Sequence, residues 1–379
     1  MSTRIAVPRE VTPGEQRVAL VPESVGRLTK GGVEVLVQSD AGSLAGFPDT
    51  SYTAAGARIE SDRAAVFRNA DLLVKIQAPT IEELSWMTPK AVVVGLLAPH
   101  RNLDRVAKLR DAQLTAFALE LLPRITRAQS MDVLSSQATV AGYKAALLGA
   151  DLCPKFLPML TTAAGTIRPS KVLILGAGVA GLMAIATARR LGGVVEAYDV
   201  RRAAGEQVRS LGAKFLELAI DAEGTGGYAR ELTTEEKAKE KEMVAKAVAD
   251  ADVVITTANI PGRKAPVLVS REMVEHMRPG AVLVDLAAES GGNCEFTEAG
   301  KTIRVAGVTV AGPLNLPSQL PYHASQMYAK NLQAFLELLL DKDGRIVPSF
   351  TDEILAASLL VHGGVVTHEP TRKLLEVAK

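Results

Sequence analysis

The chain has 379 residues, of which 47% are hydrophobic and 22% are charged, a composition typical of a globular protein with more than one domain. Its 43 Lys and Arg residues against 42 Asp and Glu leave a net charge of +1, which excludes a strong bulk attraction to nucleic acid or an anionic membrane. Cys153 and Cys294 lie in no CxxC or Cys/His pattern, so the sequence predicts no disulfide framework and no metal site, and favours a reducing, cytoplasmic setting.

Apolar runs of strand length recur through the first third of the chain. The amphipathic segment Pro22–Gly31 between two of them is predicted to be helical, because Val25, Leu28 and Thr29 share one face. Most runs are continuously apolar, as in a parallel sheet that is covered on both faces. The predicted strands are Arg4–Pro8, Val33–Gln38, Leu72–Ile76, Ala91–Leu96 and Leu114–Ala118.

A polar stretch, Pro123–Ser136, separates this first series from a second one. A helix is predicted from about Gln137, with one apolar face made by Val140, Tyr143, Ala146 and Leu147. The second series of predicted strands consists of Val172–Gly176, Val194–Asp199, Lys214–Leu218, Val253–Thr257, Ala281–Leu286 and Val308–Ala311.

Glycines at 224, 226 and 227 predict a mobile loop before a charged, solvated helix at Thr233–Lys246. The segment Ala324–Asp341 is rich in Leu and Ala and is predicted to be a helix that returns to the first domain.

Strands that alternate with helices predict the α/β class, with two doubly wound domains built on parallel sheets. Because the last helix returns to the first domain, the second domain is an insertion into the first. The predicted boundaries are 1–125 with 325–379 for the N-terminal domain, 137–320 for the inserted domain and 124–136 for a loop between them.

The run Val172–Gly181 reads VLILGAGVAG, a predicted strand followed by GxGxxG and a predicted helix. In this context Gly176 permits a tight turn, Gly178 lets the backbone approach a pyrophosphate, and Gly181 lets helix and strand pack closely. The N-terminus of the helix then faces the diphosphate. These features indicate a Rossmann-like dinucleotide site rather than a glycine turn without a ligand. They also exclude a membrane helix over the uncharged run Val172–Ala188.

Asp199 ends the next predicted strand, where a carboxylate binds the hydroxyls of the adenosine ribose and repels a 2′-phosphate. The sequence therefore predicts NAD(H) rather than NADP(H) as the cofactor, although Arg201 and Arg202 add positive charge beside this position.

The loop Arg124–Gln137 reads RITRAQSMDVLSSQ and is followed by AGYK at 141–144. This stretch resembles the NAD(H)-binding component, called domain I, of the proton-translocating nicotinamide nucleotide transhydrogenases. The similarity extends over nearly the whole chain. Further matching segments are Val7–Glu10, Pro13–Leu20, Thr162–Thr166, Gly176–Arg201, Glu206–Val208, Ser210–Phe215, Thr256–Ala258, Ile260–Gly262, Met277–Gly280, Gly291–Cys294 and Tyr328–Leu332.

The resemblance implies that the interdomain loop holds the nicotinamide. Arg124 and Gln129 would orient the ring, and Asp132 with Ser135 would bond the carboxamide or brace the loop. Guanidinium, amide and hydroxyl groups can do this without reacting. The alternative interpretation of the loop is a polar linker that caps the following helix.

The resemblance also implies the nucleotide contacts and a mobile loop whose Tyr228 closes over the nucleotide, although Tyr228 taken alone reads as a half-buried loop aromatic. The implied cofactor-binding positions are Gly176, Gly178, Val179, Ala180, Gly181, Asp199, Val200, Arg201, Tyr228, Thr257 and Ala258, together with the four loop residues.

Hydride transfer between two nicotinamides needs no acid, base or nucleophile, only aligned rings and excluded water. The resemblance implies a Si-specific, proton-translocating NAD(P)+ transhydrogenase. NADH bound here would exchange hydride with NADP(H) on a partner component, coupled to proton movement through a membrane component. The chain has no second fingerprint and no membrane span, so it is expected to be a separate subunit or a piece of a longer chain. A homodimer, with the loop Glu223–Leu232 at its interface, is expected on the cytoplasmic face of the inner membrane.

The main alternative function is that of an alanine dehydrogenase. Arg17 and Lys75 stand at the positions that bind the substrate carboxylate in that enzyme. The other interpretation of these two residues is that they are salt-bridge partners at the domain interface. That enzyme also needs a histidine after the fifth strand, where this chain has Leu96; His100 lies four residues further on. His276, His362 and His368 are not well placed for that role. A third hypothesis is a non-catalytic NAD sensor, against which the loop Arg124–Gln137 argues.

Overall fold

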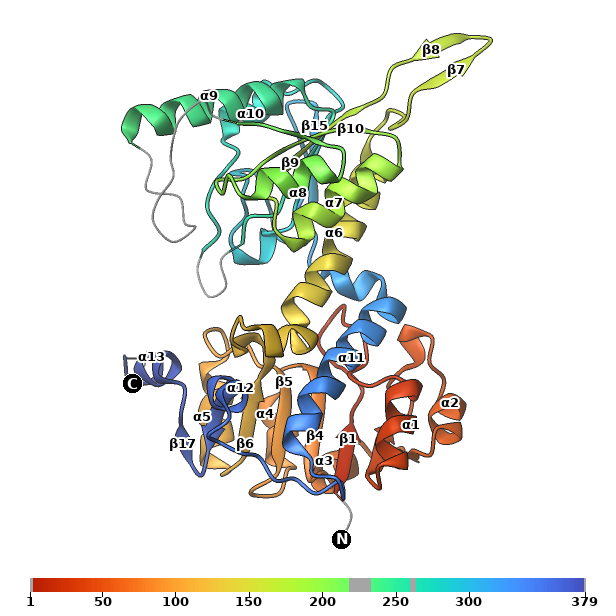
Figure 1. Cartoon of the computed structure of the whole chain (residues 1–379), viewed down its shortest axis with the longest axis vertical. Helices are drawn as coiled ribbons and strands as arrows, with labels where there is room; N and C mark the ends of the chain where they lie inside the picture. The colour runs from red at the N-terminus through yellow and green to blue at the C-terminus, as the bar shows by residue number, and fades with distance from the viewer. Residues whose placement is uncertain (1–2, 218–232, 260–263, 378–379) are drawn as a thin grey trace. The chain divides into compact units, whose positions relative to one another are not determined.

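The two series of predicted strands form two separate sheets, each in its own part of the chain. The computed structural model describes residues 3–217, 233–259 and 264–377. The chain divides into two compact units, one made of Met1–Gln137 with Ser318–Lys379 and the other of Ala138–Pro317 (Figure 1). They are called unit 1 and unit 2 below, and each is described by itself.

Unit 1 contains an eight-stranded sheet with the order β17-β16-β6-β5-β4-β1-β2-β3. The strands from β1 to β6 pair in parallel, whereas β16 is antiparallel to β6 and β17 is antiparallel to β16. The parallel sheet that the sequence predicts is therefore mixed at this edge. The strands are β1 (Arg4–Val7), β2 (Glu34–Gln38), β3 (Arg58–Glu60), β4 (Leu72–Gln77), β5 (Val92–Leu96), β6 (Thr115–Ala118), β16 (Leu359–His362) and β17 (Val365–Val366).

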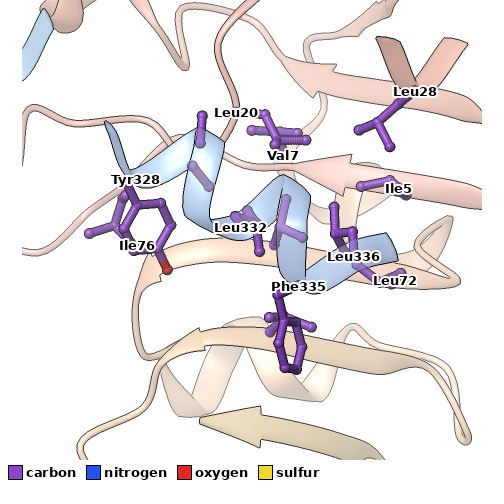
Figure 2. Packing of buried hydrophobic residues seen from close by; sticks show 14 of the residues in the cluster. Ile5, Val7, Leu20, Leu28, Leu72, Ile76, Tyr328, Leu332, Phe335 and Leu336 are labelled. Carbon is purple, nitrogen blue, oxygen red and sulfur yellow. The ribbon is translucent and has the colours of Figure 1, made fainter. Parts of the chain in front are cut away.

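Helices cover both faces of this sheet, which explains why its strands are continuously apolar. Alternate residues of one strand enter different clusters: Leu72 packs with α1, α2, α11 and α12, and Leu73 packs with α3, α4 and α5. Figure 2 shows Tyr328, Leu332, Phe335 and Leu336 of α11 against the strands that carry Ile5, Leu72 and Ile76. The helices are α1 (Pro22–Lys30), α2 (Asp49–Ala54), α3 (Arg63–Arg68), α4 (Ile81–Ser85), α5 (Leu103–Asp111), α11 (Pro321–Leu339), α12 (Glu353–Ser358) and α13 (Glu369–Val377), with 3₁₀ turns η1 (Ser43–Ala45), η2 (Leu119–Leu121) and η3 (Thr126–Met131).

Unit 2 contains a seven-stranded sheet with the order β11-β10-β9-β12-β13-β15-β14. Chain order reverses beside β9, the strand that carries the glycine fingerprint. All pairings are parallel except that of β14 with β15, so this sheet too is mixed at one edge. The strands are β9 (Lys171–Leu175), β10 (Val194–Tyr198), β11 (Lys214–Phe215), β12 (Val253–Thr256), β13 (Val282–Asp285), β14 (Thr302–Val305) and β15 (Val308–Ala311).

The faces of the second sheet are also both covered. Val172 and Ile174 of β9 pack on the side of α6, α7 and α8, whereas Leu173 and Leu175 pack on the side of α9 and α10. The helices are α6 (Val133–Leu152), α7 (Val179–Arg190), α8 (Ala204–Ser210), α9 (Thr234–Asp250) and α10 (Arg271–Glu275), with the 3₁₀ turn η5 (Ala288–Ser290).

Two predicted helices differ from the observed ones. Helix α6 begins at Val133 rather than near Gln137, and within its predicted apolar face Val140 and Ala146 are buried while Tyr143 is 42% exposed. Helix α9 matches the predicted charged helix and buries Val244 and Val248. The predicted loop with glycines 224, 226 and 227 lies outside the described residues.

An antiparallel hairpin of β7 (Leu160–Thr162) and β8 (Gly165–Ile167) was not predicted. Residues 161–168 are all exposed, and Figure 1 shows the hairpin extending away from the other strands of its unit. Separately, no helix in the part of the chain that the structure describes is long and apolar enough to cross a membrane.

Candidate nucleotide-binding site

The turn between β9 and α7 has a backbone that only glycine fits at two positions. Gly176 has φ +101°, and a Cβ added there would lie 2.5 Å from Thr257 Oγ1. A Cβ on Gly181 would lie 1.9 Å from the carbonyl oxygen of Gly176. These contacts are the tight turn and the close helix–strand packing that the fingerprint predicts.

Gly178 differs from its two neighbours because the space beside it is open. A Cβ added there would meet no atom within 4 Å. Gly178 is also the N-cap of α7, and no side chain caps this end of the helix. The first turn of α7 thus begins without a side-chain cap and beside open space at Gly178, an arrangement suited to binding a phosphate.

Helix α6 packs closely against the start of α7. A Cβ on Gly142 would lie 2.0 Å from the carbonyl oxygen of Ala180, so the AGYK motif also requires glycine for a steric reason. At this end of α7, Val179 is 42% exposed and Ala180 is half-buried.

Asp199 follows β10 and reaches back to the glycine turn. Its Oδ2 accepts a hydrogen bond of 2.7 Å from the backbone N–H of Ala177, and its Oδ1 accepts one of 2.8 Å from the N–H of Arg201. The Arg201 side chain adds bonds from Nε at 3.0 Å and Nη2 at 3.1 Å. Burial alone would raise the pKa of this carboxyl, but the bonds from Arg201 and Ala177 outweigh it and hold the pKa below its usual value.

The segment after β12 closes the other side of the turn. Thr257 Oγ1 donates to the carbonyl oxygen of Gly176 at 3.0 Å. Ala258 exchanges two hydrogen bonds with the Asn293 side chain, donating from its N–H to Oδ1 at 3.1 Å and accepting from Nδ2 at 2.8 Å. Asn293 is fully buried, and its Nδ2 also donates to Pro266 O at 2.7 Å.

Asp285, at the end of β13, holds Asn293 in place. This fully buried carboxylate accepts five hydrogen bonds: from Thr256 Oγ1 at 3.0 Å, Ala287 N at 2.9 Å, Asn293 N at 2.7 Å, Cys294 N at 3.1 Å and Thr297 Oγ1 at 2.6 Å. The sequence-based site omitted both Asp285 and Asn293. The available signal was an acidic residue at the end of a buried strand, followed shortly by an SGGN segment.

The loop predicted to hold the nicotinamide has a defined backbone and lies in unit 1. Arg124 and Gln129 are exposed, whereas Asp132 and Ser135 are half-buried and bonded to each other. Asp132 Oδ1 accepts from the N–H of Ser135 at 2.9 Å, and Oδ2 accepts from Ser135 Oγ at 2.6 Å. Asp132 directly precedes α6, so this contact is a helix cap, as the alternative interpretation of the loop expected.

The 3₁₀ turn η3 within this loop is attached to two helices of unit 1. Asn331 Nδ2 of α11 donates to Ser130 O at 2.7 Å, and Arg127 pairs with Asp352, the N-cap of α12, at 2.7 Å. Ala128 and Met131 are buried in the core of unit 1. The exposed Gln129 is therefore carried on a fixed backbone. Among the other predicted positions, Val200 is 61% exposed, and Tyr228 lies outside the described residues.

Arg17 and Lys75, the two cations that an alanine dehydrogenase would use, are buried and form ion pairs with carboxylates of the chain itself. Arg17 binds Glu15 at 2.6 Å, and Lys75 Nζ lies 3.3 Å from Glu10 and 3.2 Å from Glu83. Burial would raise the pKa of Glu83, but Lys75 and Arg63 outweigh it and lower the pKa. Glu83 is thus the ionised partner of Lys75.

The position that aligns with the histidine of an alanine dehydrogenase provides no general base. Leu96 ends β5, and His100 is exposed in the following turn. Outside this region His276 is exposed, His362 bonds Thr115 Oγ1 at 3.0 Å and His368 bonds Thr371 Oγ1 at 2.7 Å. Among the residues that the structure describes, no group of three or more His, Cys, Asp or Glu is arranged to hold a metal ion.

Comparisons with known proteins cover nearly the whole chain. The family model for the alanine dehydrogenase/PNT N-terminal domain matches residues 6–141, and that for the C-terminal domain matches residues 145–369. A relative from Rhodospirillum rubrum, named as the first part of NAD(P) transhydrogenase subunit alpha, is 45% identical over 375 residues, which are 96% of this chain and 98% of the relative. The alanine dehydrogenase of Halomonas elongata is 31% identical over 373 residues, 96% of this chain and 95% of the relative.

A crystal structure of transhydrogenase from Sinorhizobium meliloti has a TM-score of 0.89 to this chain at 46% identity, and the match covers 96% of this chain and 99% of that one. The expected α/β class with Rossmann-like domains is therefore confirmed, with sheets that are mostly parallel rather than purely so. The chain belongs to the alanine dehydrogenase/PNT family, and within it resembles the transhydrogenase alpha subunits more than the alanine dehydrogenase.

Proposed function

We propose that the chain is the NAD(H)-binding component of a Si-specific, proton-translocating NAD(P)+ transhydrogenase. The observation that carries this proposal is the β9–α7 turn: two glycines that tolerate no side chain flank Gly178, beside which the space is open, and Asp199 lies against the same turn. The relatives named as transhydrogenase alpha subunits support the same activity.

Unit 2 binds the adenosine half and the diphosphate in this proposal. The N–H groups at the start of α7 hold the diphosphate, beside Gly176, Gly178 and Gly181. Asp199 binds the adenosine ribose and disfavours a 2′-phosphate, so NAD(H) is preferred. The remaining contacts come from Val179, Ala180, Val200, Thr257 and Ala258, and Tyr228 closes over the nucleotide. Arg201 lies beside the ribose position through its hydrogen bonds to Asp199.

The loop 124–136 orients the nicotinamide. Its backbone is fixed by α11 and α12, so the Arg124 guanidinium and the Gln129 amide can hold a ring in one orientation. Asp132 and Ser135, already bonded to each other, brace the loop or offer a hydrogen bond to the carboxamide. When bound, the reduced nucleotide supplies the hydride, and NADP+ on the partner accepts it. The chain's residues position the ring and exclude water, and none has to gain or lose a proton.

The partners follow from this chemistry. An NADP(H)-binding component supplies the second nicotinamide, and a membrane-spanning component couples the transfer to proton movement. The chain itself is proposed to be a homodimer and to bind peripherally at the cytoplasmic face of the inner membrane through these partners. The sequence-based dimer loop, Glu223–Leu232, lies outside the described residues.

An amino-acid dehydrogenase is the second candidate, because the chain is 31% identical to an alanine dehydrogenase and retains Arg17 and Lys75. Such an enzyme must bind a substrate carboxylate and move a proton. Here carboxylates of the chain already occupy both cations, and Leu96 stands where the base is needed. We therefore favour the transhydrogenase component.

One experiment with the purified chain separates the two functions. NADH and NADPH are titrated by fluorescence, and ammonium with pyruvate is then added while NADH absorbance is followed. Selective NADH binding without turnover, followed by hydride exchange once the NADP(H)-binding component is added, is the expected result. Sustained pyruvate-dependent oxidation of NADH by the chain alone would instead identify an amino-acid dehydrogenase.

A further inference from the structure

The carboxylate of Asp199 has no acceptor position left for a ribose. A carboxylate offers about four lone-pair directions, two on each oxygen. Oδ1 accepts from the N–H and Nε of Arg201, at 2.8 and 3.0 Å. Oδ2 accepts from the N–H of Ala177 at 2.7 Å and from Nη2 of Arg201 at 3.1 Å. A ribose diol, which donates one hydrogen bond to each oxygen, has to replace two of these four donors.

Two of the four donors are backbone N–H groups, and their hydrogen bonds to Asp199 cannot be lost without changing the local backbone conformation. The N–H of Ala177 belongs to the glycine turn, and Ala177 is 1% exposed. The N–H of Arg201 points back to Asp199 from the chain that follows β10. The Arg201 side chain, in contrast, is 53% exposed and can rotate into solvent without disturbing the fold.

We propose that the Arg201 side chain competes with the adenosine ribose for Asp199 and thereby determines affinity and selectivity at the dinucleotide site. The proposal rests on the function proposed above. Each bound NADH must first displace a two-pronged guanidinium from the carboxylate. Because the guanidinium is mostly exposed, the ion pair between Arg201 and Asp199 is weak. Losing this ion pair changes the dissociation constant for NADH by roughly 1.5- to fivefold.

Displacement places the same guanidinium beside the ribose 2′ position. A guanidinium binds a phosphate through paired, charge-assisted hydrogen bonds, so the displaced Arg201 partly offsets the repulsion between Asp199 and a 2′-phosphate. Arg201 therefore weakens binding of NADH and assists binding of NADPH. Both effects reduce the ratio by which the site prefers NADH over NADPH.

The test compares dissociation constants for the wild-type chain, Arg201→Ala, Arg201→Met and Arg202→Ala. Arg201→Met keeps most of the aliphatic stem, and Arg202→Ala makes the same change in net charge at the next, exposed residue. NADH and NADPH are titrated by fluorescence. The 2′,3′-dideoxy form of ADP, which has no ribose diol to compete with Arg201, is titrated by calorimetry, and circular dichroism checks that each variant is folded.

Both Arg201 variants are expected to bind NADH roughly 1.5- to fivefold more tightly, NADPH no more tightly than wild type, and the dideoxy nucleotide with unchanged affinity. Unchanged or weaker NADH binding in both Arg201 variants would overturn the proposal, because Arg201 would then be a neutral or direct contact. The same gain in Arg202→Ala, or an equal gain for the dideoxy nucleotide, would also overturn it by showing a general charge effect. If the wild-type chain bound no NADH at all, the proposed function itself would fail.

Discussion

Two glycines of the fingerprint turn have opposite surroundings, so substituting them separates folding from binding. Gly181→Ala puts a Cβ 1.9 Å from a backbone oxygen, and we expect it to lower the free energy of unfolding by about 1–3 kcal/mol. Gly178→Ala meets no atom within 4 Å, so its stability should match wild type while its NADH affinity falls at least roughly tenfold. Urea unfolding and NADH titration measure the two effects. Wild-type NADH affinity in Gly178→Ala would contradict the placement of the diphosphate.

The buried carboxyls around Lys75 make stability depend on pH. Burial raises the pKa of Glu10, although Lys75 and the N–H of Ile76 act against it. The carboxyl is therefore protonated more readily in the folded than in the unfolded chain. Its favourable contribution is present below the ordinary pKa of a glutamate and is lost as the pH rises through the raised value.

The substitution Glu10→Gln removes the contribution of Glu10 to the pH dependence of stability. The amide keeps an acceptor for the N–H of Ile76, and Lys75 keeps Glu83 as its counter-ion. We expect the variant to match wild type near pH 4 and to be about 1 kcal/mol more stable at pH 7 by urea unfolding. Glu23→Gln, in an exposed pair with Arg27, is the control and should be nearly neutral at both pH values. A marked loss of stability in Glu10→Gln at pH 7 would show that Glu10 is ionised and needed.

Among the secondary-structure elements, the 3₁₀ turn η3 depends on helix α11 for its position. Asn331→Ala removes the hydrogen bond to Ser130 O and so loosens the backbone that carries Gln129, although the Arg127–Asp352 pair remains. Because the adenosine half is proposed to bind unit 2, NADH affinity should change less than roughly threefold while hydride exchange with the NADP(H)-binding partner slows by roughly tenfold or more. Stopped-flow transfer assays measure this difference. Glu337→Ala, an exposed change on the same helix, should leave both quantities unchanged.

In the molecule as a whole, unit 2 is contiguous in sequence and contains hydrophobic clusters on both faces of its sheet. A fragment of residues 132–317 keeps the Asp132 cap of α6 and the whole described part of the fingerprint site. We expect it to unfold cooperatively and to bind NADH within roughly tenfold of the full chain, but to support no hydride exchange, since Arg124 and Gln129 are absent. A folded fragment that does not bind NADH would place essential contacts in unit 1.

The amino-acid sequence alone predicts the features that depend on short-range geometry or continuous burial. A glycine turn after an apolar strand has one backbone solution, so the fingerprint could be located from Val172–Gly181 without a structure. The parallel strands of both sheets were found, except β3, because burial on two faces requires uninterrupted apolar residues. Strand β3 (Arg58–Glu60) was missed because it is a short edge strand with no buried residue. The helical pattern of α11 followed from its composition, which is rich in Leu and Ala, whereas its place in unit 1 is seen only in the folded chain.

The features whose cause lies in distant residues became visible only in the folded chain. The edge strands β14, β16 and β17 are short, and their antiparallel direction depends on which strand they meet. Nothing in the local sequence predicts that Asn293 would bond Ala258, 35 residues earlier, or that Asp285 would accept five hydrogen bonds. The position of η3 likewise comes from α11 and α12, which follow it by some two hundred residues. Hydrogen-bond partners are chosen by distance in space, and the folded sheets bring these side chains together.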